Sequence, residues 1–203
     1  MPVPSPVSII LLAGGEARRL PGKLGLHLGG EPLLLRTYRR LTDDRRRPCV
    51  VSIHTSLDPA IRSELHVPLI EDRYGRCGPL GGLLSAAEDL DGPLFFAAAG
   101  DLPFLQAAFI DRLEQHYVEL CAAGGARPAA LIPRRRDGSV EPLAALYETA
   151  QFVQGARNAL QRGERKVTAA LTYAMIAYLD LTGADEEMLM NINTPADWER
   201  VQA

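Results

Sequence analysis

Cysteine and histidine patterns that bind metals or form disulfides are missing from this sequence of 203 residues. Its three cysteines, Cys49, Cys77 and Cys121, make neither a CxxC pair nor the spacing of a zinc site. An odd, scattered set is typical of reduced thiols in a cytoplasmic protein, which argues against a disulfide framework. The four histidines make no HExxH or HxH pattern, so we expect no structural or catalytic zinc.

Long apolar runs and an excess of positive charge are also missing. The longest apolar stretches fall well short of the ~20 residues that span a bilayer, and no positively charged segment precedes the first apolar run. The net charge is −3, whereas proteins that coat nucleic acids or membrane surfaces usually carry a basic excess. We therefore expect a cytoplasmic protein that binds neither nucleic acid nor a membrane.

The composition is that of a globular protein, with 47% hydrophobic and 23% charged residues. A chain of this length buries one sizeable core and is too short for two domains of ordinary size. Internal repeats, low-complexity tracts and linkers are absent from the sequence. We therefore predict that residues 1–203 form a single domain.

Continuous apolar runs that suit strands buried on both faces alternate with segments of helical spacing. We expect strands at 7–13, 49–55, 66–72, 92–101, 127–133, 141–148 and 175–181. We expect helices at 31–41, 58–65, 78–90, 106–120, 149–162, 167–174 and 194–202. This alternation predicts an α/β fold with a Rossmann-like, doubly wound, mostly parallel sheet. In such sheets the ligand lies beyond the carboxyl ends of the strands.

The stretch "LLAGGEARRLPGK" (11–23) follows the first expected strand and combines bare backbone with positive charge. Gly14 and Gly15 let backbone N–H groups approach phosphate oxygens closely. Arg19 can bind two oxygens at once, and Lys23 supplies a compact charge on a flexible stem. The stretch matches neither a Walker A loop nor the G-x-G-x-x-G fingerprint of dinucleotide oxidoreductases. It is either a phosphate-binding loop or an ordinary strand-to-helix loop with solvated arginines.

Asp101 ends the apolar strand expected at 92–101, where its charge needs a cation or hydrogen bonds. Beside phosphates, Mg²⁺ is the natural partner, because it binds one or two carboxylates together with substrate oxygens. The alternative role of Asp101 is to cap the turn before Pro103. Together, the basic loop and this carboxylate indicate metal-assisted chemistry on a nucleoside triphosphate.

Two further stretches carry weaker signals. In "IEDRYGRCGPLGGLLSA", Asp72 ends an expected strand, and the following glycines make a backbone-rich wall where a flat base could lie. Ordinary loop glycines are the alternative explanation. In "NINTPADW", Asn191 and Asn193 come just before an expected helix, where capping and packing are the alternative to a role in the site.

Taken in order along the chain, these stretches resemble the sequence motifs of the molybdenum cofactor guanylyltransferases. These enzymes are nucleotidyltransferases of the nucleotide-diphospho-sugar transferase type. The matching pieces are "LLAGGEARRLPGK", "GEPLLLRTYRRL", "EDRYGRCGPLGGLLSA", "GDLPF", "EPLAALY" and "NINTPADW", spread from residue 11 to residue 198. The resemblance implies that the terminal phosphate of molybdopterin carrying molybdenum attacks the α-phosphate of GTP. The products would be a pterin–guanine dinucleotide and pyrophosphate. The resemblance also implies transient contacts with other proteins of cofactor biosynthesis or molybdoenzyme maturation.

Carried over position by position, the resemblance also implies roles for the residues of the first loop. Leu12, Ala13 and Gly14 would contact the nucleotide through backbone groups. Lys23 would hold the triphosphate and steady the departing pyrophosphate, with Arg19 assisting.

The resemblance assigns the remaining polar residues to other parts of the site. Asp72 would lie toward the base and ribose, and Asp101 would bind Mg²⁺. Asn191 and Asn193 would serve the metal or the pterin side.

Two departures from the family pattern bear on the substrate. The loop "RLPGK" lacks the Asp that usually precedes the lysine, and it looks more like the loop of cytidylyltransferases that activate acidic sugars. After the second expected strand, "SIHT" stands where the family often has an Asn near the base. One alternative is therefore a cytidylyltransferase acting on molybdopterin or on another phosphorylated or acidic small molecule. Another is a protein that binds nucleotide and cofactor without turnover.

Overall fold

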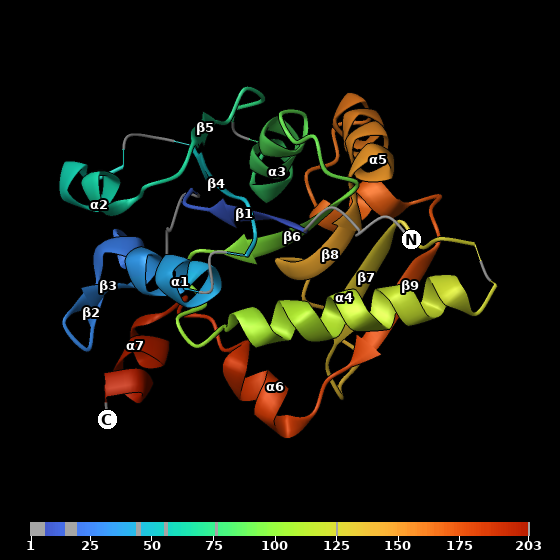
Figure 1. Cartoon of the computed structure of the whole chain (residues 1–203). Coiled ribbons are helices and arrows are strands. Elements are labelled where there is room, and N and C mark those ends of the chain that lie inside the picture. The colour runs from blue at the N-terminus through green and yellow to red at the C-terminus, as the bar shows by residue number, and fades with distance from the viewer. Residues whose placement is uncertain are drawn as a thin grey trace.

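A computed structural model describes residues 7–14, 20–43, 46–54, 57–75, 77–124 and 126–202 (Figure 1). Its strands are β1 (Ser8–Leu12), β2 (His27–Leu28), β3 (Glu31–Pro32), β4 (Cys49–Ile53), β5 (Leu69–Glu71), β6 (Leu94–Ala99), β7 (Ala130–Arg134), β8 (Ala144–Glu148) and β9 (Ile176–Asp180). Its helices are α1 (Leu33–Thr42), α2 (Pro59–Glu64), α3 (Pro79–Ala87), α4 (Ala107–Ala122), α5 (Thr149–Gln161), α6 (Gly183–Met188) and α7 (Pro195–Gln202), with 3-10 turns η1 (Lys23–Gly25) and η2 (Val167–Leu171). Among the described helices, none combines the length and the apolar character that crossing a bilayer requires.

Seven of these strands form one sheet in the order β5-β4-β1-β6-β8-β7-β9. Strand β1 runs parallel to β4 and β6, β4 parallel to β5, and β7 parallel to β9. Strand β8 is antiparallel to both of its neighbours, β6 and β7. The expected Asp-Gly turn joins β7 to β8, with Gly138 in the left-handed region at φ 85°. The prediction of a mostly parallel α/β sheet is confirmed.

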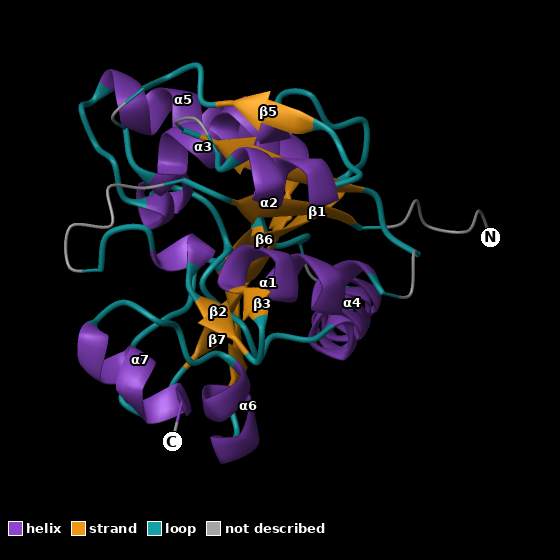
Figure 2. Cartoon of the chain, turned by 90° about the vertical axis from the view of Figure 1, so that its left-hand side faces the viewer, coloured by secondary structure: helices purple, strands orange, loops and turns teal. Residues whose placement is uncertain are grey.

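Helices cover both faces of this sheet (Figure 2). Alternate side chains of β1 point to opposite faces, as the pleat of a strand requires. Ile9 and Leu11 pack into the core shared with α1 and α4. Ile10 and Leu12 pack into the core shared with α3 and α5. Because both faces are buried, a ligand can approach the central strands only at their ends.

Most expected helices and strands are present with shifted ends, but several segments differ from the prediction. The small antiparallel sheet of β2 and β3 was not expected, and β3 occupies the start of the helix expected at 31–41. The helix expected at 167–174 is the shorter 3-10 turn η2. Helix α6 was not expected, although its start carries a recognisable signal: the hydroxyl of Thr182 accepts from the N–H of Asp185, and the Asp185 side chain accepts from the N–H of Thr182. This reciprocal capping box satisfies N–H groups that would otherwise lack partners at a helix start.

Candidate active site

The carboxyl ends of β1, β4 and β6 meet at one edge of the sheet, and backbone hydrogen bonds fix the residues that follow them. The N–H of Ala13 donates to the carbonyl oxygen of Ser52 at 2.8 Å. The N–H of Gly100 donates to the carbonyl oxygen of Leu12 at 3.0 Å. The side chains and backbone groups beyond these strands therefore start from a rigid frame.

Lys23, Asp101 and Asn193 come together at this edge, although they belong to three separate parts of the chain. The ammonium group of Lys23 forms a hydrogen-bonded ion pair with Oδ2 of Asp101 and donates to Oδ1 of Asn193 at 2.6 Å. The Lys23 side chain is 17% exposed and that of Asp101 is 9% exposed. One ammonium group is thus shared by two oxygen acceptors in a partly desolvated position, where charges interact more strongly than in water.

The turn η1 sets the position of Lys23. Gly22 precedes it with φ 69°, in the left-handed region that favours glycine. The N–H of Gly25 donates to the carbonyl oxygen of Gly22 at 2.9 Å, which closes the turn. Leu24 packs against the core below, so the lysine beside it is directed to the edge of the sheet.

Close packing of Gly100 sets the position of Asp101. A Cβ atom on Gly100 would lie 2.8 Å from the carbonyl oxygen of Leu12 and 2.7 Å from Cδ1 of Leu34. The hydroxyl of Thr37 donates to the Gly100 carbonyl oxygen at 3.2 Å. A larger residue at position 100 would push β6 away from β1, so the glycine is what brings Asp101 to the edge.

The segment before α7 sets the position of Asn193. Ile192 is fully buried, and its N–H donates to the carbonyl oxygen of Asp101 at 3.1 Å. The N–H of Asn193 donates to Oδ2 of Asp197 at 3.0 Å, which anchors the start of α7. Asn191 is exposed. Of the two candidate asparagines, Asn193 is therefore the one that reaches Lys23.

Asp72 lies in a separate cluster at the ends of β4 and β5. Its Oδ1 atom accepts from the N–H groups of Tyr74 at 2.9 Å and Gly75 at 3.2 Å. Its Oδ2 atom lies 3.3 Å from Nδ1 of His54, and the Asp72 side chain is only 3% exposed. The structure thus joins Asp72 to a histidine that the sequence analysis did not select, although His54 directly follows β4 as Asp72 follows β5.

The backbone-rich wall of glycines expected after Asp72 is only partly open to a nucleotide base. Gly81 and Gly82 are buried in α3 and face the sheet. A Cβ atom on Gly81 would lie 3.0 Å from Oδ1 of Asp72, and one on Gly82 would lie 2.8 Å from Oγ of Ser52. These two glycines therefore allow α3 to pack closely on β4 and β5, and they do not present backbone to a base.

The remaining residues of the expected nucleotide loop differ in exposure. Leu12 and Ala13 are each 7% exposed, and Gly14 is exposed directly after them. A Cβ atom on Gly14 would lie 2.8 Å from Cβ of His54, so the backbone of the loop starts against that histidine. The expected residues Gly15 and Arg19 lie outside the described part of the chain.

The side-chain oxygens that surround Lys23 are of the kind that binds Mg²⁺. Within the described residues, no group of three or more His, Cys, Asp or Glu side chains gathers to hold a metal ion. Asp101 and Asn193 nevertheless supply one carboxylate and one amide oxygen around a single positive charge, the ammonium group of Lys23. Mg²⁺ takes oxygen ligands of this kind and completes its octahedron with water and phosphate oxygens.

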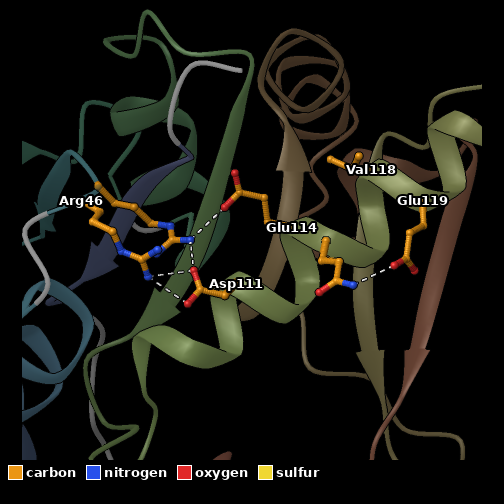
Figure 3. Close-up of a pocket in the computed structure, with 7 residues that line it drawn as sticks. Arg46, Asp111, Glu114, Val118 and Glu119 are labelled. Carbon is orange, nitrogen blue, oxygen red and sulfur yellow. Dashed lines mark hydrogen bonds and ion pairs between the residues drawn. The ribbon is translucent and has the colours of Figure 1, made fainter. Parts of the chain in front are cut away.

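A pocket of about 340 Å³ lies at the other end of the parallel strands, beside the start of β4 and along α4 (Figure 3). Arg46 and Arg47 enter it from the chain before β4 and bind Asp111, and Arg47 also binds Glu114 at 2.9 Å. Burial acts to raise the pKa of the Asp111 carboxyl, but the hydrogen bonds and charges of these arginines together outweigh it and lower that pKa. The pocket is thus lined by ion pairs within the protein and is separate from the site at the carboxyl ends.

Comparison with known proteins identifies the family of the chain. A family model described as a MobA-like NTP transferase domain matches residues 9–175. A Pyrococcus furiosus protein named "Probable molybdenum cofactor guanylyltransferase" is 30% identical over 198 residues, which cover 95% of this chain and 94% of that protein. A Synechococcus elongatus protein of the same name is 32% identical over 195 residues, which cover 95% and 96%.

Solved structures share the fold. Molybdopterin-guanine dinucleotide biosynthesis protein A from Archaeoglobus fulgidus superposes with a TM-score of 0.76 at 24% identity, over 97% of both chains. 2-C-methyl-D-erythritol 4-phosphate cytidylyltransferase from Thermus thermophilus superposes with a TM-score of 0.66 at 18% identity, also over 97% of both. The family match extends from the first buried strand to the residue before β9, and it includes Lys23, Asp72 and Asp101. On that match the chain belongs to the MobA-like NTP transferases and is a nucleotidyltransferase.

Proposed function

We propose that this protein transfers GMP from GTP to the terminal phosphate of molybdopterin carrying molybdenum, with Mg²⁺ as cofactor. The observation that carries this proposal is the meeting of Lys23, Asp101 and Asn193 at the sheet edge where β1 and β6 end. A lysine beside two oxygens of the kind that bind a divalent cation, at the strand ends where nucleotides bind in this kind of fold, supports it. The names of the relatives support the choice of guanine and of molybdopterin.

The reaction needs alignment and charge neutralisation, and no covalent intermediate with the enzyme. An oxygen of the molybdopterin phosphate attacks the α-phosphorus of GTP in line with the bond to the bridging oxygen. That bond breaks, and its electrons leave with pyrophosphate. Because nucleophile and leaving group are both anions, the protein accelerates the step mainly by holding them in line and by offsetting negative charge.

Each residue of the cluster has a task in this scheme. Lys23 binds the β- and γ-phosphates and stabilises the charge that develops on the departing pyrophosphate. Asp101 and Asn193 would hold Mg²⁺, which when bound would neutralise phosphate oxygens and orient the triphosphate. The exposed backbone of Gly14 lets the nucleotide lie close to the end of β1. A triphosphate and a metal ion together would replace the contacts that Lys23 and Asp101 now make with each other.

A cytidylyltransferase is the second candidate, because the loop "RLPGK" resembles that of cytidylyltransferases. The test is to incubate the protein with molybdenum-loaded molybdopterin, Mg²⁺ and each of the four ribonucleoside triphosphates, and to follow pyrophosphate release. We expect release with GTP only, and loss of release when EDTA removes the metal. Faster release with CTP would replace the guanine assignment, and no release with any triphosphate would leave a binding protein without turnover.

The proposal also covers the setting of the reaction. We propose that the protein works in the cytoplasm and that other proteins of cofactor biosynthesis or molybdoenzyme maturation contact it transiently. These contacts would deliver molybdopterin and collect the dinucleotide.

A further inference from the structure

Strand β9 ends the sheet, and in the part of the chain that the structure describes it pairs with β7 alone (Figure 1). At the opposite end of the sheet, β5 is three residues long and ends in the charged Glu71. Short length, charged side chains and proline are the usual means by which proteins keep edge strands from pairing with other chains. Strand β9 is longer, with the sequence IAYLD, and its one charged side chain, Asp180, stands at the last position. The outer side of β9 is therefore open to a further strand.

The backbone groups of β9 face alternately toward β7 and away from it. The N–H of Leu181 donates to the carbonyl oxygen of Arg134 in β7 at 2.9 Å. Because successive residues of a strand direct their N–H and C=O groups to opposite sides, the odd-numbered residues of β9 face β7. The N–H and C=O groups of the even-numbered residues face outward, and these residues are Ile176, Tyr178 and Asp180.

Exposed apolar side chains gather at the same edge. Within the described residues, four large apolar side chains are exposed, and three of them lie within six positions: Tyr173 at 93%, Met175 at 47% and Tyr178 at 41%. The fourth, Val118, lies on α4. Apolar side chains that cluster at the surface of a soluble protein mark interaction sites. The open backbone of β9 and this cluster thus indicate one surface for a protein partner.

A second copy of the chain supplies a strand that fits this edge. If two copies of β9 pair antiparallel about a two-fold axis at Tyr178, this residue faces Tyr178 of the second copy, and Ile176 faces Asp180 of the second copy. In an antiparallel ladder every second pair of residues exchanges both N–H···O=C bonds. All three outward-facing residues then find an outward-facing partner. Any other register leaves at least one of them without a partner in the other strand.

The charges at the edge are compatible with this pairing. Asp180 forms an ion pair with Arg134 of its own chain at 2.8 Å, and in the paired strands it faces the apolar Ile176. The Arg134 guanidinium lies 5.0 Å from the centre of the Tyr178 ring, so each tyrosine at the axis carries a cation that Asp180 already neutralises. Like charges of the two strands therefore do not stand opposite each other, an arrangement that would oppose pairing.

We propose that the chain forms a two-fold symmetric dimer through β9, in which two seven-stranded sheets join into one continuous sheet with Tyr178 at the axis. The interface uses the same surface of both copies and is complete with two chains. Strand β9 is parallel to β7, and β8 is antiparallel to both β7 and β6, so β9 runs in the direction of β6 and β1. The candidate active sites of an antiparallel pair therefore lie at opposite edges of the joined sheet, and each chain keeps a complete site.

Sedimentation equilibrium of the full chain tests the dimer. A sheet-edge interface is small, so we expect a Kd in the micromolar range and twice the mass of one chain at ~100 μM. Tyr178→Pro removes an outward-facing N–H at the axis and no bond to β7, a position at which edge strands tolerate proline. It should sediment as a monomer, and a cooperative urea transition shows that it is folded. Tyr178→Thr keeps the N–H and a side chain that favours strands, so this control should still dimerise, with a Kd raised at most about tenfold.

Cysteine cross-linking tests the register. In a chain with Cys77 and Cys121 replaced by serine, Tyr178→Cys places two thiols opposite each other, with Cα atoms ~5.5 Å apart, within the range of a disulfide. Asp180→Cys is the matched control, because its two Cα atoms would lie ~14 Å apart, too far to be bridged. Oxidation followed by non-reducing electrophoresis should give a covalent dimer with Tyr178→Cys and a monomer with Asp180→Cys.

The outcomes are independent of the proposed function, because none of these measurements uses a nucleotide. A wild-type protein that stays monomeric at ~100 μM, or a folded Tyr178→Pro variant that stays dimeric, overturns the inference. A covalent dimer that forms with Asp180→Cys and not with Tyr178→Cys also overturns it, because the strands would then pair in another register.

Discussion

The Nζ atom of Lys23 lies 2.6 Å from Oδ1 of Asn193, although the two residues are 170 positions apart in the chain. The same ammonium group also binds Asp101, which follows the central strand β6. The first loop, a strand in the middle of the sequence and the segment before α7 thus converge on one charge. Replacement of Lys23, Asp101 or Asn193 should therefore affect the other two side chains, because the ammonium group of Lys23 binds both of the others.

The first prediction concerns Lys23. Lys23→Ala should lower the rate of nucleotidyl transfer by about 10²–10³-fold, since it removes a cation placed for the leaving pyrophosphate. Pyrophosphate release at saturating GTP measures the effect. Lys166→Ala removes the other lysine of the chain, which is exposed, and should leave the rate unchanged. A Lys23→Ala enzyme that keeps more than about a tenth of the wild-type rate would contradict the role assigned to this residue.

The second prediction concerns metal binding without nucleotide. The Lys23 ammonium group and a divalent cation compete for the Asp101 carboxylate, so Lys23→Met should bind Mn²⁺ about three- to tenfold more tightly than the wild type. Titration of free Mn²⁺ by electron paramagnetic resonance gives the affinities. Asp101→Asn introduced into the same variant should abolish the gain. If Mn²⁺ binds both proteins equally, the metal does not use the carboxylate that Lys23 occupies.

The third prediction concerns two glycines at which an added methyl group meets different surroundings. A Cβ atom on Gly155 would lie 1.9 Å from the carbonyl oxygen of Ala170, so Gly155→Ala must push α5 away from η2. We expect a loss of about 1–3 kcal/mol in the free energy of unfolding, measured with urea. At Gly183, in the first turn of α6, nothing lies within 4 Å of an added Cβ. Gly183→Ala should therefore stay within about 0.5 kcal/mol of the wild type.

The fourth prediction concerns stability in acid. Burial acts to raise the pKa of Asp185, but hydrogen bonds from the N–H and hydroxyl of Thr182 and the ion pair with Arg112 at 2.7 Å outweigh it and lower the pKa. A carboxyl whose pKa is lower in the folded state stabilises the fold above its unfolded pKa, about 3.9, and loses that contribution as the pH falls toward the folded value.

Replacement of this carboxyl shows the effect directly. Asp185→Ala should cost about 1 kcal/mol of unfolding free energy at pH 7, the usual scale for losing a helix cap. The difference from the wild type should shrink as the pH falls from 4 to 3. Urea unfolding at pH 7, 4 and 3 measures it. A difference that stays constant with pH would mean that the ionised form of Asp185 gives no special stabilisation.

The fifth prediction concerns thiol reactivity. Burial raises the pKa of the Cys49 thiol to about 12, and this residue begins strand β4. Cys77 and Cys121 are partly buried. Because the thiolate is the reactive form, Cys49 should react with DTNB at least about 100-fold more slowly than the other two in the folded protein. Cys49→Ser should remove only the slow phase, and equal rates for all three thiols would contradict the burial of β4.

Local pattern was sufficient to predict the strands that carry the site. The runs that became β1, β4 and β6 are largely apolar because both sides of each strand are covered, with Ser8 and Ser52 as the polar exceptions. Gly14 and Asp101 come two residues after the ends of β1 and β6. The sequence also predicts the turn between β7 and β8, because an Asp-Gly pair separates two apolar segments. It does not predict that β8 lies between β6 and β7, since strand order depends on long-range packing.

The candidate site could be predicted only in part, because its contacts also depend on long-range packing. Lys23 and Asp101 were selected as separate signals, and their direct contact depends on the fold of residues far apart in sequence. Asp72 is predicted to lie toward the nucleotide, and the structure adds contacts of its oxygens with neighbouring N–H groups and with His54, which spacing does not reveal. Gly81 and Gly82 illustrate the same limit, because a glycine pair in a sequence does not tell whether its backbone faces a ligand or a strand.

The bond between Lys23 and Asn193 has a consequence for the order of events during synthesis. The strands β1, β4 and β6 of the parallel core are all made once residue 99 has been added to the chain, but Asn193, which binds Lys23, lies 94 positions further along (193 − 99). A nascent chain can therefore assemble these strands well before Lys23 gains its asparagine partner, so the proposed nucleotide site is completed only after translation has passed residue 193.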